Sequence, residues 1–253
     1  MDKPALWKEL VADTLKQLGG TASLKDITAS LKKNPLRPQT ATWNATIRRV
    51  VRQYKIFTPI EMADGLAGYS LVEPDEPKPK ENFTKEDPHG EQQGMLLRLG
   101  MLCGYETFTN STDKTIRRFG GEPISKFATV RNDADALSAL PIKKMRNTDV
   151  MWMAEDSEGL YPRYVFEVEH STGVKSGLIR LLQIPERFNA QLFIIGSGND
   201  EEKLFKRYMA ETPFRQHVEK IQFHFYDEVR NFYMSGTAFD NHRKSWAIQS
   251  VGQ

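Results

Sequence analysis

The first quarter of the chain contains three short runs in which apolar residues recur at the spacing of a helix. The runs are PALWKELVADTLKQLGG (4–20), SLKDITASLKKN (23–34) and TATWNATIRRVVRQY (40–54). Gly19 and Gly20 are typical of a helix exit, and Ser23 is suited to cap the second helix. The next run, KIFTPIEMADGLAGYSLVE (55–73), alternates and contains the turn sequence ADG. The pattern therefore predicts three helices followed by a β-hairpin.

From residue 88 onward, helical and strand-like patterns succeed one another. We expect helices over 88–104, 174–188 and 200–218, and strands over 105–110, 147–153, 161–170, 190–197 and 221–229. Residues 115–145 have no clear period, apart from a short helix predicted at DADALSALP (133–141). This order predicts an α/β (α+β) domain with a mixed central sheet flanked by helices.

Charge divides the chain at the same place as the pattern. Residues 1–72 hold eleven Lys or Arg against six Asp or Glu, whereas residues 73–91 hold three lysines against seven acids. A basic module followed by an acidic, proline-containing segment predicts domains at 1–73 and 88–253, joined by a linker at 74–87. No apolar run approaches the roughly 20 residues of a membrane span. With the single Cys103, which we expect in the core, this indicates an intracellular, cytoplasmic protein.

The strand-like run YVFEVEH (164–170) carries two acids that project from the same side. Side chains alternate along a strand, so Glu167 and Glu169 point one way while Phe166 and Val168 point the other. Asp149 begins the preceding strand, and antiparallel pairing would bring it beside the two glutamates. Burying three carboxylates is costly unless a cation lies among them. An all-oxygen ligand set favours Mg²⁺, with Mn²⁺ as a substitute.

The third predicted helix offers side chains that can contact nucleic acid. Its polar side carries Asn44, Arg48, Arg49, Arg52 and Gln53, which can pair with base edges or phosphates. An ordinary solvated helix face, or a protein-binding surface, explains the same residues. Through LKDI, WNATIRRVV and GYSLV, residues 4–72 resemble the HARE-type winged helix attached to some restriction endonucleases. That resemblance implies that the first module binds double-stranded DNA.

The acids of the second module resemble the PD-(D/E)XK nuclease motif. Its parts would be Asp149 and Glu167-Val168-Glu169, with Thr148 in place of the motif's proline and Glu169 in place of its lysine. The resemblance, which covers about residues 88–197, implies that Glu91 is a further acid of the site. Glu169 would then be a metal ligand or the general base, and Lys175 would supply the missing positive charge and contact DNA.

Together these features predict a Mg²⁺-dependent DNA endonuclease similar to type II restriction enzymes, and that resemblance implies a prokaryotic source. Cutting both strands requires two active sites or two events, so we expect a homodimer at least on DNA. One alternative is a DNA-binding regulator whose nuclease-like domain is inert and only dimerises, which the missing lysine favours. Another is a nuclease acting on RNA or on branched or damaged DNA.

Four further residues of the second module have two readings or a structural one. Arg180 and Gln183 could line the cleft of the site or belong to a polar outer face of their helix. Ser171 and Thr172 could cap that helix.

Overall fold

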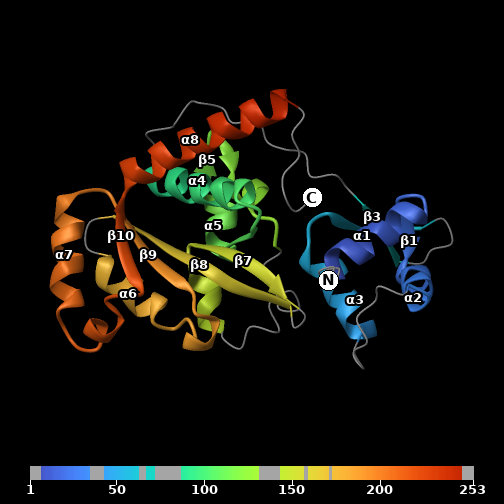
Figure 1. Ribbon diagram of the computed structural model, residues 1–253, viewed down its shortest axis with the longest axis horizontal. Helices are drawn as coiled ribbons and strands as arrows, with labels where there is room; N and C mark the ends of the chain where they lie inside the picture. Colours follow the sequence, from blue (N-terminus) through green and yellow to red (C-terminus); the bar gives the residue numbers. More distant parts are fainter. Residues whose placement is uncertain are drawn as a thin grey trace. The chain divides into compact units, whose positions relative to one another are not determined.

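The computed structural model describes residues 7–34, 43–62, 67–71, 87–130, 143–156, 159–170 and 173–246. The chain forms two compact units (Figure 1). The first unit comprises Met1–Glu76 with Thr129–Leu140 and Glu155–Leu160, and the second comprises the remainder. Two short segments from the second half of the sequence thus belong to the first unit, which the charge pattern did not indicate. The predicted linker lies outside the described residues except for Asp87.

The first unit contains the predicted helices and hairpin. The helices are α1 (Trp7–Gln17), α2 (Leu24–Lys32) and α3 (Trp43–Gln53), and the hairpin strands are β2 (Phe57–Glu61) and β3 (Ala67–Leu71). Ser23 caps α2 as predicted, since its side chain accepts a hydrogen bond from the backbone N–H of Asp26. The structure adds β1 (Thr21–Ser23), which pairs antiparallel with β3 and gives a sheet in the order β1-β3-β2.

The second unit is built on a five-stranded mixed sheet in the order β10-β9-β8-β7-β4. The strands are β4 (Glu106–Thr109), β7 (Val150–Asp156), β8 (Gly159–Glu169), β9 (Gln191–Gly196) and β10 (Ile221–Phe225). β8, β9 and β10 run parallel to one another, whereas β4 is antiparallel to β7. β7 and β8 are neighbours separated by two residues of sequence, a connection that permits only antiparallel pairing. The predicted mixed sheet is confirmed.

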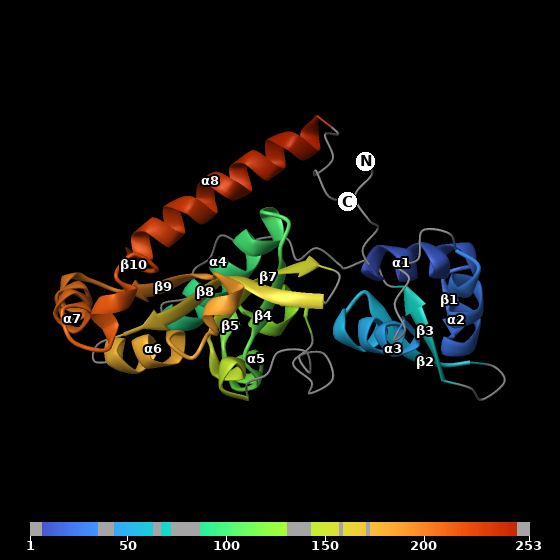
Figure 2. The ribbon, with the colours of Figure 1, turned by 60° about the horizontal axis from the view of Figure 1, so that its bottom comes forward.

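Helices cover both faces of this sheet. They are α4 (Pro88–Leu102), α5 (Ser111–Ile116), α6 (Val174–Leu181), α7 (Asn199–Met209) and α8 (Tyr226–Ser245). α8 packs on α4 on one side of the sheet, and α6 packs on β9 on the other (Figures 1 and 2). Short elements fill part of the region that had no clear period: β5 (Arg118–Phe119), β6 (Glu122–Pro123), and the 3-10 turns η1 (Ile124–Phe127) and η2 (Lys143–Asn147). The short helix predicted at 133–141 lies outside the described residues.

Four sequence predictions about the second unit are wrong. The helix predicted over 200–218 ends at Met209, and a separate 3-10 turn, η4 (Phe214–His217), follows Pro213. The last strand ends at Phe225, because α8 begins at Tyr226 and takes over the residues assigned to that strand. α6 ends at Leu181, so the predicted helix over 174–188 is about half as long; a separate 3-10 turn, η3 (Glu186–Phe188), follows it. Cys103 is exposed rather than in the core, because it is the C-cap of α4 and lies beyond the last helical turn that faces the sheet. Among the described residues, no helix combines the length and apolarity needed to cross a bilayer.

α4 lies unusually close to its neighbours because it carries glycines where it meets them. A Cβ at Gly94 would overlap the side chain of Phe119, and one at Gly100 would overlap Thr107 and Trp152. Trp152 also donates a hydrogen bond from Nε1 to the carbonyl oxygen of Leu96, at 2.8 Å. This contact fixes α4, and with it the residues of its first turn, against the sheet.

We expect Gly94→Ala to destabilise the second unit by about 1–3 kcal/mol, because the added methyl group forces Phe119 out of a packed core. Urea unfolding followed by tryptophan fluorescence measures the loss. Gly236→Ala on α8 is the matched control, since its Cβ would meet only flexible leucine side chains and alanine favours the helix. Equal effects of the two substitutions would contradict the close approach of α4.

Candidate functional site

The two acids of β8 project from the sheet toward α6. Glu167 has no exposed surface, and Glu169 is buried as well. Their neighbours Phe166 and Val168 belong to the hydrophobic core on the α4 and α8 side. Strand alternation therefore separates the two acids from the apolar side chains, as the sequence predicts. This arrangement places two carboxylates within a segment that is buried on both faces.

Arg180 of α6 forms ion pairs with both acids. Its Nε donates a hydrogen bond to Glu167 Oε2 at 2.8 Å, and its Nη2 donates one to Glu169 Oε1, also at 2.8 Å. α6 can approach β8 this closely because its first turns carry glycines: a Cβ at Gly173 or Gly177 would overlap the Glu169 carboxylate. The positive charge that the sequence assigned to Lys175 is thus provided by Arg180.

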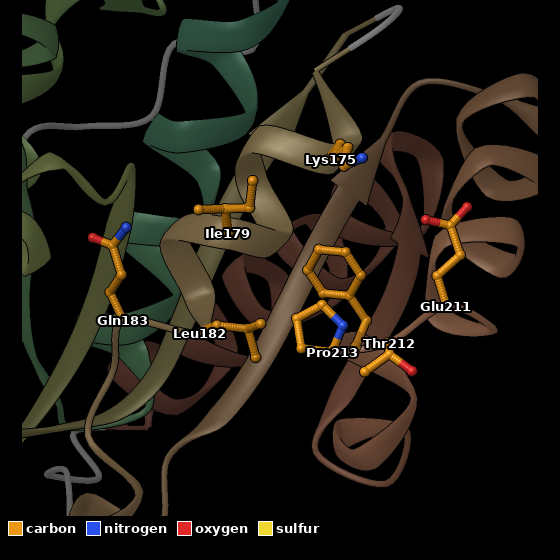
Figure 3. A pocket seen from close by; sticks show the side chains of 8 residues that line it. Lys175, Ile179, Leu182, Gln183, Glu211, Thr212 and Pro213 are labelled. Atoms are coloured by element: carbon orange, nitrogen blue, oxygen red, sulfur yellow. The ribbon is translucent and has the colours of Figure 1, made fainter.

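Lys175 lies on another side of α6. Its Nζ is 5.3 Å from the ring centroid of Tyr208, and it lines a pocket with Ile179, Leu182 and Gln183 of α6. Figure 3 shows these residues together with Glu211, Thr212 and Pro213, which also line that pocket. The prediction that Lys175 replaces the motif's lysine is therefore not supported. Gln183, which the sequence placed on one face with Arg180, belongs to this pocket too.

Asp149 is attached to the same end of the sheet through a backbone hydrogen bond. It immediately precedes β7, and its Oδ2 accepts a hydrogen bond from the backbone N–H of Val168 at 2.8 Å. Val168 lies between the two glutamates in sequence, so this bond holds Asp149 next to them. The structure thus places all three acids of the predicted trio at the same end of the sheet, with Asp149 bonded to the backbone between the two glutamates.

The ionised forms of the glutamates are electrostatically disfavoured even with Arg180 present. Burial and the charge of Asp149 raise the pKa of Glu167 well above its ordinary value, against the opposing effect of Arg180. Burial also raises the pKa of Glu169. Burial by itself lowers the pKa of Arg180, but its hydrogen bond with Glu167 and the nearby acids raise it overall. The charges at this site are therefore not balanced by one guanidinium.

The second oxygen of Glu167 lacks a hydrogen-bond partner. Glu167 Oε1 is buried and has no hydrogen-bond partner among the described residues, whereas Oε2 is bonded to Arg180. Leaving a buried carboxylate oxygen without a donor costs several kcal/mol. An additional cation or donor is the physical remedy, and an all-oxygen set of carboxylates is suited to Mg²⁺ or Mn²⁺.

Two side chains missed by the sequence analysis, His89 and Asp113, also lie beside Asp149. His89 Nε2 is 3.4 Å from Asp149 Oδ2, and one ligand atom each from His89, Asp113 and Asp149 lie within 4.8 Å of one another. Asp113 is held in place by hydrogen bonds from Gln93 and Asn110, both 2.6 Å long. These residues come from α4 and α5, whose packing could not be read from motif spacing.

Glu91 does not join this cluster. Two residues after His89, it is rotated by roughly 200° around α4 and accepts a hydrogen bond from the backbone N–H of Gly120 at 3.1 Å. The prediction that Glu91 adds a further acid to the site is therefore not supported, and His89 is the residue of that helical turn that reaches Asp149. Ser171 and Thr172, which could cap the helix after β8, lie outside the described residues.

The nucleic-acid candidates of the first unit separate into exposed and buried residues. Asn44, Arg48 and Arg52 are exposed on α3, and Arg49 is half-buried. Gln53 is only 1% exposed, because it follows Val50 by three positions and lies on the helix side that faces the core. Gln53 is therefore removed from the predicted contact face.

We expect Arg180→Met to destabilise the protein by about 3–5 kcal/mol near neutral pH, because it leaves two buried carboxylates without their partner. The loss should shrink at lower pH. The folded state binds the Glu167 proton more tightly than the unfolded chain does, so stability falls as pH rises above the ordinary pKa of 4.5, and the substitution enlarges that fall. Urea unfolding at pH 5 and pH 8 measures both effects.

Lys175→Met on the same helix is the control for this substitution, since its side chain is exposed and does not contact the acids. It should have a small effect that is the same at both pH values. A loss for Arg180→Met that does not change between pH 5 and pH 8 would contradict the electrostatic account.

Most of the chain is similar to a known protein family. The family described as the type II restriction enzyme NmeDI C-terminal domain matches residues 71–243, more than half of the chain. The type II restriction enzyme NmeDI of Neisseria meningitidis serogroup C is 27% identical over 154 residues, which cover 57% of this chain and 42% of the relative. The match thus spans less than half of that relative. No solved structure matches. By the extent of the family match, this chain belongs to the family of the type II restriction enzyme NmeDI C-terminal domain.

Proposed function

We propose that the protein is a metal-dependent endonuclease that hydrolyses phosphodiester bonds in double-stranded DNA, as a type II restriction enzyme of the PD-(D/E)XK class. The observation that carries the proposal is the buried, incompletely paired Glu167 carboxylate beside Asp149 and Glu169, in a chain of a restriction-enzyme family. Burying a carboxylate cluster of this kind costs free energy, and a role in binding a catalytic metal would explain why the cluster is present.

Asp149, Glu167 and Glu169 would hold the metal. All three offer hard oxygen ligands, and Glu167 Oε1 is a buried oxygen that has no hydrogen-bond partner among the described residues. Bound Mg²⁺, or Mn²⁺ as a substitute, would lower the pKa of a coordinated water and polarise the scissile phosphate. His89 lies next to Asp149 and would orient its carboxylate, and Asp113 would offer a further ligand oxygen beside it.

Glu169 and Arg180 would together replace the lysine of the motif, Glu169 as the proton acceptor and Arg180 as the positive charge. Burial raises the pKa of Glu169, so an oxygen of this carboxylate that does not bind the metal would be a better acceptor for the proton of the attacking water. Arg180 carries the positive charge, and its two hydrogen bonds keep Glu167 and Glu169 in fixed orientations. An arginine keeps its proton throughout, so its role would be electrostatic and positional.

The first unit would bind the DNA as a winged helix. Helices α1, α2 and α3 and the β1-β3-β2 sheet have the element order of that fold. Asn44, Arg48 and Arg52 are exposed on α3, which would be the helix that enters the groove, with Arg49 at its margin. Since both strands must be cut, the active form would be a homodimer at least on DNA.

We expect Asp149→Asn and Glu167→Gln each to reduce Mg²⁺-dependent cleavage of duplex DNA by at least about 10²-fold, because each removes a charged ligand from the site. The assay follows linearisation of methylated and unmethylated phage and plasmid DNA, with single-stranded RNA and branched DNA as alternative substrates. Glu91→Gln is the matched control, since that acid is buried elsewhere on α4 and should leave cleavage nearly unchanged if the protein folds.

The second candidate is a DNA-binding regulator with an inert nuclease-like domain, which Arg180 favours by already pairing with both glutamates. Wild-type protein that binds duplex DNA yet leaves every substrate intact in Mg²⁺ and in Mn²⁺ would support it. Cleavage that persists in Asp149→Asn and Glu167→Gln would instead refute the site.

For the first unit, we expect Arg48→Gln with Arg52→Gln to weaken DNA binding and to flatten its salt dependence. Each lost phosphate contact should lower the slope of log K against log salt by about 0.9. Fluorescence anisotropy on a DNA duplex from 50 to 300 mM salt measures the slope. Lys16→Gln, an exposed cation on α1, should leave the slope unchanged, and an unchanged slope in the double variant would exclude these arginines from phosphate contact.

A further inference from the structure

His89, Asp113 and Asp149 form a cluster whose chemistry differs from that of the strand glutamates. His89 belongs to the first turn of α4, Asp113 belongs to α5, and Asp149 immediately precedes β7. One ligand atom from each of the three side chains lies within 4.8 Å of the other two. The cluster shares Asp149 with the acids of β8, but it adds an imidazole nitrogen, which those acids lack.

The imidazole of His89 is placed as a metal ligand would be. Its Nε2 is buried and makes no hydrogen bond among the described residues, although Asp149 Oδ2 is only 3.4 Å away. Two ligands of a tetrahedral metal ion are about 3.4 Å apart at metal–ligand distances near 2.1 Å, and both point at the ion rather than at each other. The other separations, of up to 4.8 Å, mean that a bound ion would draw the side chains together by up to about 1.4 Å.

Asp113 is held beside His89 by buried polar side chains. Its Oδ2 accepts hydrogen bonds from Gln93 Nε2 and Asn110 Nδ2, both 2.6 Å long. Gln93 has no exposed surface, and its Oε1 has no hydrogen-bond partner among the described residues. Donors of this kind fix the carboxylates that bind metal ions. The unpaired Gln93 oxygen would accept a hydrogen bond from a metal-bound water, which gives this buried amide its missing partner.

The charge of the cluster suits a divalent cation. Asp113 and Asp149 contribute two negative charges. Arg117 lies nearby, but its Nη1 is 2.9 Å from Asp87 Oδ1, whereas its Nε is 3.6 Å from Asp113 Oδ1. Asp87 therefore offsets most of the Arg117 charge, because the shorter contact is the stronger one. The two acids around His89 thus keep a net charge that one divalent ion would neutralise.

We propose that His89, Asp113 and Asp149 bind a first-row transition-metal ion, with Zn²⁺ as the best fit, in addition to the Mg²⁺ of the proposed nuclease site. Imidazole nitrogen suits Zn²⁺, whereas Mg²⁺ takes oxygen ligands. The three ligands come from three elements, so the ion ties α4 and α5 to the start of β7 and stabilises the fold. This inference goes beyond the proposed function, because it assigns a second ion and depends on neither DNA binding nor cleavage.

Isothermal titration calorimetry with Zn²⁺ in excess Mg²⁺ tests the site, because Mg²⁺ then occupies the all-oxygen positions. All proteins carry Cys103→Ser, which removes the exposed thiol as a competing ligand. The otherwise unchanged chain should bind one equivalent of Zn²⁺. His89→Asn should weaken this binding by at least about 100-fold, since losing a partner that only orients a ligand already costs 10–100-fold. His242→Asn, at an exposed histidine of α8, is the matched control and should bind Zn²⁺ normally.

Glu167→Gln separates this site from the proposed nuclease site. It should change Zn²⁺ affinity by less than about 10-fold, because Glu167 is not a ligand of the second ion. Thermal unfolding provides another readout: Zn²⁺ should raise the Tm of the Cys103→Ser and Glu167→Gln proteins but not that of His89→Asn, whose own transition shows that it is folded.

Three results would each overturn the proposal. They are the absence of a Zn²⁺ equivalent in excess Mg²⁺, undiminished Zn²⁺ binding by His89→Asn, and an equal loss of binding in Glu167→Gln. The last result would place the ion among the acids of β8. A chain that binds Zn²⁺ as expected but cleaves no DNA would support the second ion and count against the proposed function alone.

Discussion

The arrangement of the second unit depends on one electrostatic constraint, the burial of two glutamates on the same side of β8. Removing a carboxylate from water costs several kcal/mol unless a positive group meets it. Arg180 meets both, and it can do so because Gly173 and Gly177 let α6 approach the Glu169 carboxylate without a clash. The glycines of α6 allow the close approach, and the charge of Arg180 then offsets the cost of burying Glu167 and Glu169.

The same end of the sheet collects the remaining polar groups of the candidate site. Asp149 is fixed by the backbone N–H of Val168, and His89 reaches it from the first turn of α4. α4 holds its position because Gly94 and Gly100 allow close packing against the core. Because helices pack closely on both faces of the sheet, their charged side chains lie together with the strand carboxylates at this end of the sheet. A cluster so concentrated, and with an oxygen of Glu167 still unpaired, is suited to a cation-dependent reaction.

The sequence was most informative where a short period determines direction. Strand alternation correctly placed Glu167 and Glu169 together, because a period of two leaves no choice of face. It was least informative where the answer depends on how a helix is rotated against its neighbours. Arg180 rather than Lys175 meets the acids, and His89 rather than Glu91 reaches Asp149, because the phase of α6 and α4 is set by glycine contacts with distant residues.

The central claim is that the carboxylates of β8 and Asp149 form a cation site that Arg180 alone does not satisfy. A crystal of the wild-type protein soaked in Mn²⁺, measured for anomalous scattering, tests it most directly. We expect an anomalous peak at metal–ligand distance from Glu167 and Asp149 oxygens, which is about 2.1 Å for Mg²⁺ at such a site. Density that shows Arg180 still bridging both glutamates at saturating Mn²⁺, with no anomalous peak beside them, would contradict it.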